Sequence, residues 1–211
     1  LQKLVSFMEE NKKYSVVRDD GYIVDENDNT VILGKMADAN YDKYNEHLFD
    51  NAILERNFQF GYSLVRTTDF LKINPKRTIY PSREGQNWQI LLPVYYKYKR
   101  GFLDKPLYRY VIYSSSMSQG DDTVNKKILR EIEHEEIVFN TLERMNMTKK
   151  ERKYYKKIFA NLIKDNLFNI VVQNEMFVET LKCFIKLLGT EYMNKDKIVD
   201  LIVLIRKKLQ K

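Results

Sequence analysis

The prolines and nearly all the glycines of this 211-residue chain stop at residue 120. All four prolines and six of the seven glycines lie within residues 1–120, and Gly189 is the exception. Because both residue types interrupt helices, the part that lacks them can form long helices, whereas the first part favours short elements. In the second part, apolar residues recur at helical spacing at Ile128, Ile132, Phe139 and Leu142, and again at Tyr155, Phe159 and Leu162. We therefore predict an α/β region over 1–120 followed by an all-α helical region over 121–211.

Short helical and extended segments alternate in the first region. The helices we expect lie at 1–13, within 44–54, at 68–71 with Thr68 as N-cap, and at 88–96. The strands we expect lie at 14–17, 21–24, 30–33, 58–66, 102–103 and 107–113. Turn-forming residues predict turns at Asp19-Asp20-Gly21, at Asn27-Asp28-Asn29 and at Asp104-Lys105-Pro106.

The second region is predicted to contain helices only. The segment 152–188 is one long helix or two, and Gly189 fits the position just beyond a helix end. The last apolar segment, 198–205, is too short to cross a bilayer, which takes about 20 residues. A helix that is apolar on most sides needs burial, and packing within its own region is the simplest way to provide it. Contact with a second copy of the chain or with a membrane surface stays open as an alternative.

Charge and cysteine usage narrow the setting of the protein. Its 36 basic and 29 acidic residues give a net charge of +7, of which +2 falls in 1–120 and +5 in 121–211. The excess is concentrated at 149–157, where six basic residues surround Glu151. This run could meet anionic groups, although a solvated helix face is the simpler interpretation. The lone Cys183 cannot form an internal disulfide and indicates a reducing, intracellular compartment.

Several kinds of active site are not supported by the sequence. Histidine occurs only at His47 and His134, and the second lies among glutamates without another histidine one turn away, so a zinc site is not expected. The chain has neither a glycine-rich phosphate loop nor a Gly-x-Ser-x-Gly elbow. Acidic clusters at Asp19-Asp20 and at Asp25-Glu26-x-Asp28 have oxygen ligands suited to Mg²⁺ or Mn²⁺, but turn formation explains them more simply.

The segment from Pro81 to Gln89 is the most unusual in the chain. It gathers a cation, a carboxylate, three amides and an indole at the junction between a long polar loop and a helix. These groups hydrogen-bond to and stack on a sugar or a similar polyol. An equally simple interpretation is that Ser82 and Asn87 cap the helix and that Trp88 belongs to the core.

A resemblance to a known family rests on several segments in a fixed order and spacing. They are Asn57-Phe58, Tyr62-Ser63-Leu64-Val65-Arg66-Thr67, residues 80–93 with Gln86-Asn87-Trp88 as the most specific part, Gly101-Phe102-Leu103-Asp104, residues 106–112 and Ser116-Met117-Ser118. Together they resemble the carboxyl-side half of bacterial family-2 glycosyltransferases. The resemblance covers about residues 1–118, and Leu1 to Lys13 looks like the helix that follows the metal-binding Asp-x-Asp of that family.

The resemblance implies a GT-A fold whose Rossmann-like amino-terminal half binds a nucleotide-sugar donor, with a divalent metal, Mg²⁺ or Mn²⁺, at the Asp-x-Asp. We expect that donor half to lie upstream of Leu1, so that this chain alone would be an inactive fragment. No metal site is evident in the chain itself.

The resemblance also implies roles for individual residues. Many members have an acidic pair before the tryptophan, one carboxylate acting as general base, but Gln86 and Asn87 stand at those positions here. Amides cannot accept a proton at neutral pH, so Glu84 becomes the candidate base. Gln86, Asn87 and Trp88 become candidate acceptor contacts, and Arg83 could meet an anionic acceptor or the diphosphate. Tyr113 stands where the family often has a basic residue near the diphosphate.

We therefore expect residues 1–120 to form the acceptor side of a cytoplasmic glycosyltransferase. Residues 121–211 would form a helical extension that could approach the inner face of the membrane. The intact enzyme would transfer a sugar from a nucleotide-sugar donor to a glycan or other hydroxyl acceptor of a bacterial cell-surface polysaccharide. The alternative is a non-catalytic glycan- or anion-binding scaffold module that uses the basic run at 149–157. We do not expect nucleic acid as a partner.

Overall fold

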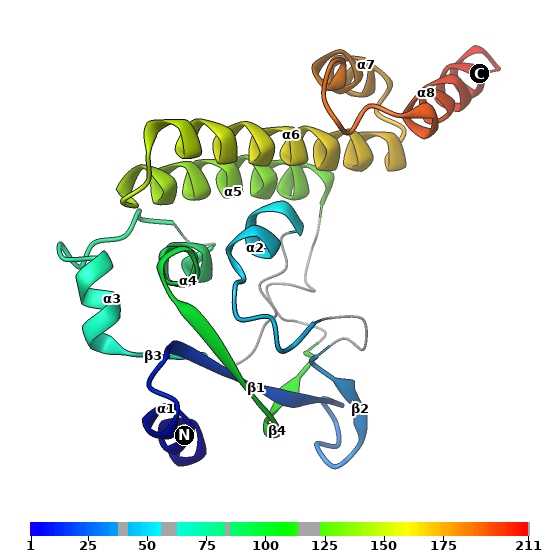
Figure 1. Cartoon of the computed structure of the whole chain (residues 1–211). Helices are drawn as coiled ribbons and strands as arrows, with labels where there is room; N and C mark the ends of the chain where they lie inside the picture. Colours follow the sequence, from blue (N-terminus) through cyan, green and yellow to red (C-terminus); the bar gives the residue numbers. More distant parts are fainter. Residues whose placement is uncertain (38–41, 56–62, 83–84, 114–122, 211) are drawn as a thin grey trace. The chain divides into compact units, whose positions relative to one another are not determined.

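The computed structural model describes residues 1–210 except for 38–41, 56–62, 83–84 and 114–122. The chain divides into two compact units (Figure 1). The first comprises Leu1–Tyr80 and Asn87–Gly120, and the second comprises Pro81–Gln86 and Asp121–Lys211.

The first unit is a mixed α/β structure, as predicted. Its helices are α1 (Gln2–Glu10), α2 (Phe49–Glu55), α3 (Thr67–Ile73) and α4 (Gln86–Lys97), and its strands are β1 (Tyr14–Val24), β2 (Ile32–Lys35), β3 (Ser63–Val65) and β4 (Lys99–Val111). The predicted strand 58–66 is seen as β3, and its residues before Ser63 lie outside the described part. Thr68 was expected to cap α3, but that prediction is wrong because the helix begins one residue earlier and its N-cap is Arg66.

Strand β1 is the centre of the sheet. It pairs antiparallel with β2 through Tyr22 and Lys35 and antiparallel with β3 through Val17 and Leu64. It pairs parallel with β4 from Tyr14 to Val24, which is its whole length. Since β4 occupies one edge of β1 throughout, β2 and β3 share the other edge. The described strands thus form a mixed sheet with one parallel pair, and not a Rossmann-like parallel sheet.

The predicted turn at Asp19-Asp20-Gly21 is wrong, because β1 runs straight through these residues. Arg18, Asp19 and Asp20 are all buried in the sheet. The glycine serves a close approach and not a turn: a Cβ atom at Gly21 would lie 2.5 Å from Cζ of Tyr108 on β4. The local sequence is typical of a turn, but pairing with β4 along the full strand determines the structure.

The predicted turn at Asp104-Lys105-Pro106 is wrong as well, because β4 is a single strand from Lys99 to Val111. The pairing with β1 moves from Leu103 directly to Pro106, so two extra residues form a bulge. In that bulge the carboxylate of Asp104 accepts hydrogen bonds from Lys43 Nζ at 2.6 Å and from the hydroxyl of Tyr44 at 2.9 Å. Proline is tolerated there because a bulge interrupts the ladder.

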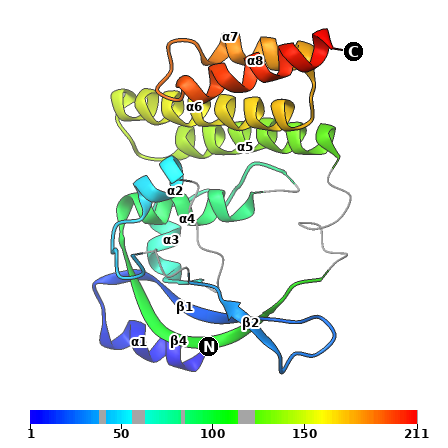
Figure 2. The ribbon, with the colours of Figure 1, turned by 90° about the vertical axis from the view of Figure 1, so that its right-hand side faces the viewer.

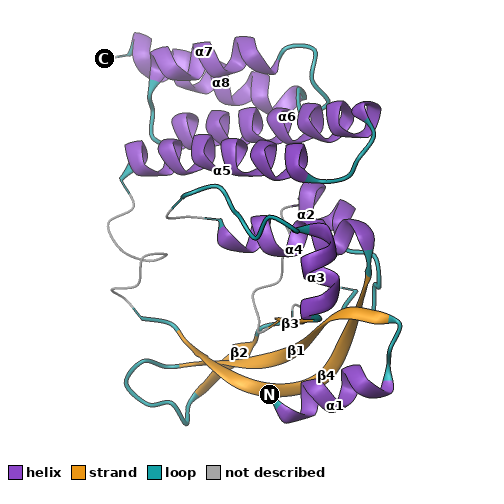
Figure 3. Cartoon of the chain, turned by 90° about the vertical axis from the view of Figure 1, so that its left-hand side faces the viewer, coloured by secondary structure: helices purple, strands orange, loops and turns teal. Residues whose placement is uncertain are grey.

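Helix α1 lies on one face of the sheet, and α2, α3 and α4 lie on the other (Figure 3). Leu4 and Met8 of α1 pack against Val17 of β1. Neighbouring residues of a strand point to opposite faces, so Asp19 shares the α1 face with Val17, whereas Arg18 and Asp20 point to the other face. This alternation decides which side chains can meet in the first unit.

The second unit consists of α5 (Val124–Arg144), α6 (Lys149–Gln173), α7 (Phe177–Leu187) and α8 (Lys195–Leu209), as expected for a helical region. Helices α5 and α6 form an antiparallel pair, and α7 and α8 lie side by side (Figure 2). The segment 152–188 thus contains two helices, separated at Glu175, whose φ is +53°. Gly189 follows α7 with a φ of +76°, in the left-handed conformation expected just after a helix end.

The turn between α5 and α6 is held by polar side chains. Thr148 and Glu151 form a capping box at the start of α6. Arg152 donates from Nε to the carbonyl of Leu142 at 3.1 Å and pairs with Glu143 at 3.0 Å. Among the described helices, none combines the length and the apolar character needed to cross a membrane.

Candidate functional site

The predicted acceptor contacts lie at the start of α4. Gln86 and Asn87 are its first two residues, and both are exposed. Trp88 is only 6% exposed. It therefore belongs to the core, as the simpler interpretation of the segment from Pro81 to Gln89 predicted. Arg83 and Glu84, the candidate anion contact and the candidate base, lie outside the described residues. Tyr113 is exposed, two residues beyond the end of β4.

Gln89, the third amide of the segment from Pro81 to Gln89, is buried and holds Tyr80 in place. Its side-chain amide donates to the carbonyl of Tyr80 at 2.8 Å, and its side-chain oxygen accepts from the backbone N–H of Tyr80 at 2.5 Å. Gln89 is only 2% exposed, so leaving either backbone group without a partner would be costly. The two bonds attach Tyr80 to the first turn of α4. Two residues upstream, the amide of Asn87 remains accessible to a ligand.

Arg66, within the segment that carries the resemblance, has a structural position. Its Nε donates to the carbonyl of Tyr14 at 2.9 Å, and its Nη2 donates to the carbonyl of Met8. The guanidinium thus joins the end of α1 to the start of β1, and β3 leads directly into it. Arg66 therefore stabilises the first unit through its bonds to the backbone.

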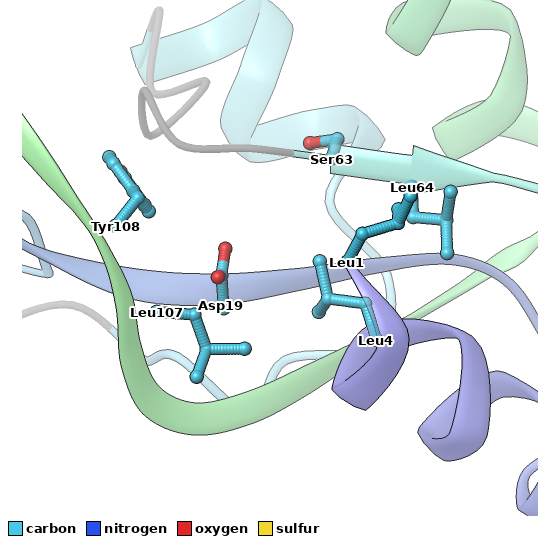
Figure 4. Close-up of a pocket in the computed structure, with 7 residues that line it drawn as sticks. All are labelled: Leu1, Leu4, Asp19, Ser63, Leu64, Leu107 and Tyr108. Carbon is cyan, nitrogen blue, oxygen red and sulfur yellow. The ribbon is translucent and has the colours of Figure 1, made fainter.

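A second place of interest is a pocket of about 300 Å³ on the α1 face of the sheet (Figure 4). It is formed by the start of α1 and by β1, β3 and β4, and its lining residues are Leu1, Leu4, Asp19, Ser63, Leu64, Leu107 and Tyr108. The carboxylate of Asp19 points from β1 into this space (Figure 4). The walls are therefore mostly apolar, with one carboxylate at the floor.

Asp19 is only 4% exposed, and within the described part of the chain its Oδ1 has no hydrogen-bond partner. Burial raises the pKa of the Asp19 carboxyl to about 6, since it disfavours the charged form. Its own backbone N–H, Arg18 and the amino group of Leu1 act in the opposite direction, and Asp20 adds to the increase in pKa. A buried carboxylate oxygen that has no hydrogen-bond partner, such as Oδ1 of Asp19, is unusual in a folded protein.

The acidic clusters do not form a metal site. Asp19 and Asp20 point to opposite faces of β1, and Asp20 Oδ1 accepts from the backbone N–H groups of Gly21 and Ala37 at 2.8 and 3.0 Å. At the predicted turn between β1 and β2, the carboxylates of Asp25 and Asp28 accept hydrogen bonds from their own turn. Over the described ranges, no three histidine, cysteine, aspartate or glutamate side chains gather as metal ligands would.

The basic run in α6 is divided between structure and surface. Arg152 and Lys156 point toward α5, where both pair with Glu143, at 3.0 and 2.6 Å. Lys149, Lys153 and Lys157 are exposed, and their spacing of four residues places them along one side of α6. These three lysines, together with the exposed Lys150, form the part of the run that an anionic partner could reach.

Compared with known protein families, with curated proteins and with solved structures, the chain has no significant match. The case for a function therefore depends on its own residues and their positions.

Proposed function

We propose that this chain forms the acceptor-side part of a GT-A-type glycosyltransferase, which transfers a sugar from a nucleotide-sugar donor to a glycan or other hydroxyl acceptor. The support begins with the order and spacing of the resembling segments. Four of them, 62–67, 80–93, 101–104 and 106–112, contribute to β3, α4 and β4. Apart from Pro81–Gln86, which belongs to the second unit, these four segments lie in the first unit.

The observation on which the proposal depends most is the arrangement at the start of α4. Exposed amides at Gln86 and Asn87 precede buried side chains at Trp88 and Gln89, and Gln89 forms two hydrogen bonds with the backbone of Tyr80. An amide can both donate to and accept from a hydroxyl, which is the recognition that a sugar acceptor requires. A surface held in place before the ligand arrives loses less entropy on binding.

Under this proposal the remaining roles follow from the resemblance. Glu84 takes the proton of the attacking hydroxyl, and Arg83 meets an anionic acceptor or the diphosphate. The donor and its Mg²⁺ or Mn²⁺ belong to a donor half outside these 211 residues, so the chain alone should bind acceptor without turnover. The intact enzyme would work in the cytoplasm, at the inner face of the membrane.

The test measures binding of oligosaccharides to the whole 211-residue chain. Saturation-transfer NMR detects the binding, and both neutral and acidic oligosaccharides are tried. The double variant Gln86→Ala, Asn87→Ala should weaken the best ligand about tenfold, since each lost hydrogen bond costs about 0.5 to 1.5 kcal/mol. Asn146→Ala, which removes an exposed amide between α5 and α6, is the matched control and should leave binding unchanged. Absence of any oligosaccharide binding, or equal binding by the double variant, would contradict the proposal.

A second candidate function, an anion-binding scaffold, is favoured by one observation: Lys149, Lys153 and Lys157 are exposed along one side of α6. The test is co-sedimentation with vesicles containing anionic lipid at low salt. Changing all three lysines to glutamine should abolish binding if this surface is responsible, because each lysine contributes about 1 kcal/mol near an anionic membrane. Lys12, Lys76 and Lys105, which are exposed in the first unit, provide the matched triple control. Vesicle binding that is lost equally in both triple variants would remove this candidate.

A further inference from the structure

We propose that the pocket around Asp19 binds a small organic ammonium ion, an alkylamine or arylalkylamine whose apolar part lies against the leucines. This inference is independent of the proposed glycosyltransferase function and concerns the opposite face of the sheet from α4 (Figure 3). It depends on two observations that point to the same ligand: a pocket with apolar walls, and a buried carboxylate that points into it and whose Oδ1 has no hydrogen-bond partner among the described residues.

The charge of the ligand follows from Asp19. The side chain is 96% buried, so water solvates an ionised carboxylate there poorly, and an opposite charge is the most effective compensation. An ammonium group supplies both that charge and hydrogen-bond donors for the carboxylate oxygens. A metal ion is a poor alternative, because Asp19 would be the sole carboxylate ligand among the residues that line the pocket.

The body of the ligand follows from the walls. Leu1 and Leu4 at the start of α1, Leu64 of β3 and Leu107 of β4 provide aliphatic surface. The hydroxyls of a sugar would find few partners against these side chains, whereas an alkyl chain or an aromatic ring loses nothing by leaving water. If each non-hydrogen atom with its hydrogens occupies about 30 Å³, as a water molecule does, a pocket of about 300 Å³ holds about ten such atoms. Phenethylamine is a molecule of about this size.

The ring of Tyr108 is a further group that favours a cation at this position. It lies over Gly21, two residues beyond Asp19 on the same face of β1, and an aromatic ring face attracts an ammonium group.

The charged groups that act on Asp19 are few, so the pH dependence of binding can be stated. Arg18 and Asp20 point to the other face of β1, and the Leu1 amino group lies at the rim of the pocket. Only the ionised carboxylate attracts the ammonium ion. With a pKa of about 6, Asp19 is almost fully ionised at pH 7.5 and about one-tenth ionised at pH 5.

The experiment is an NMR titration of the full chain with phenethylammonium at pH 7.5, with phenethyl alcohol as the uncharged counterpart. We expect the ammonium ion to bind at least tenfold more tightly than the alcohol and to shift the methyl resonances of Leu4, Leu64 and Leu107. Binding should weaken about tenfold between pH 7.5 and pH 5.

Asp19→Asn should weaken binding of the ammonium ion at least tenfold while keeping the shape of the side chain. Asp196→Asn, which neutralises an exposed carboxylate at the start of α8, is the control and should have no effect. The pH titration of the unmodified chain tests the same point if Asp19→Asn fails to fold. Equal binding of amine and alcohol, equal binding by Asp19→Asn, shifts located elsewhere, or no binding at pH 7.5 would each overturn the proposal.

Discussion

The ring of Tyr108 lies so close over Gly21 that a Cβ atom there would come within 2.5 Å of its Cζ. Gly21→Ala should therefore push the ring or the strand aside and lower the free energy of unfolding by about 1 to 3 kcal/mol, as overpacking does. Urea unfolding measures the change. Gly34→Ala on the neighbouring strand β2 is the control, since a Cβ atom there meets nothing within 4 Å and should alter stability by less than about 0.5 kcal/mol. Equal effects of the two substitutions would refute the contact.

Gln89→Leu should destabilise the first unit by about 2 to 3 kcal/mol. The substitution keeps an apolar body of similar length but removes both hydrogen bonds to Tyr80, so a backbone N–H and a carbonyl lose their partner. Chemical denaturation followed by tryptophan fluorescence reports on it directly, because Trp88 is the neighbouring residue and the only tryptophan. Gln173→Leu at the exposed end of α6 should have little effect, and similar losses in both variants would count against the role of Gln89.

Stability should depend on pH through Asp19. The folded-state pKa of about 6 lies above the unfolded value of 3.8, so the folded protein holds this proton more tightly than the unfolded chain does. The contribution of Asp19 is therefore most favourable below about pH 4 and is lost as the pH rises through 6, by up to about 3 kcal/mol. Asp19→Asn should remove this dependence, so that the variant gains stability relative to the unmodified chain between pH 4 and 7.5. Parallel stability profiles for the two proteins would show that the shift is absent.

Lys197 of α8 should be essential to the helical unit. Its ammonium pairs with Asp165 of α6 at 2.8 Å, with side chains only 11% and 16% exposed, and also donates to Asn169. Lys197→Met leaves the Asp165 charge buried without its cation and should cost about 3 to 5 kcal/mol. Thermal unfolding followed by circular dichroism at 222 nm measures the loss.

The ion pair of Lys207 with Glu175 provides the control for that measurement. It is equally close, at 2.6 Å, but its side chains are 54% and 47% exposed. Lys207→Met should therefore change stability by less than about 1 kcal/mol. If the two lysine variants lose the same amount of stability, burial does not distinguish the two pairs.

The helical unit was predictable because its signal is local. The near absence of glycine and proline after residue 120 and the apolar spacing indicated long helices, and α5 to α8 follow. The sheet was less predictable, since Asp19-Asp20-Gly21 is typical of a turn and only pairing with β4, more than 80 residues away, keeps β1 straight. Gly21 was misinterpreted for the same reason: its explanation is Tyr108, which is distant in the sequence.

The candidate site shows the same division. The exposed amides at Gln86 and Asn87 could be noticed from the sequence, because an unusual cluster of polar groups precedes a tryptophan. The bonds between Gln89 and Tyr80 could not, since a glutamine in a helix gives no sign of burial. The pocket at Asp19 could not be predicted either, because it requires the register of three strands and the position of α1. The signal that the sequence did contain was an aspartate, Asp19, between the two β-prone runs at 14–17 and 21–24.

The parallel pairing of β1 with β4 has a consequence for how the protein forms during synthesis. Tyr14 pairs with Lys99 and Val24 with Val111. Almost ninety further residues must therefore be synthesised before β4 can pair with the central strand β1. Helices α5 and α6 join through a short capped turn and need only each other. Contacts between distant residues form slowly and local ones quickly. The carboxyl-terminal helices, although they leave the ribosome last, can therefore reach their native pairing before the sheet made ahead of them is complete.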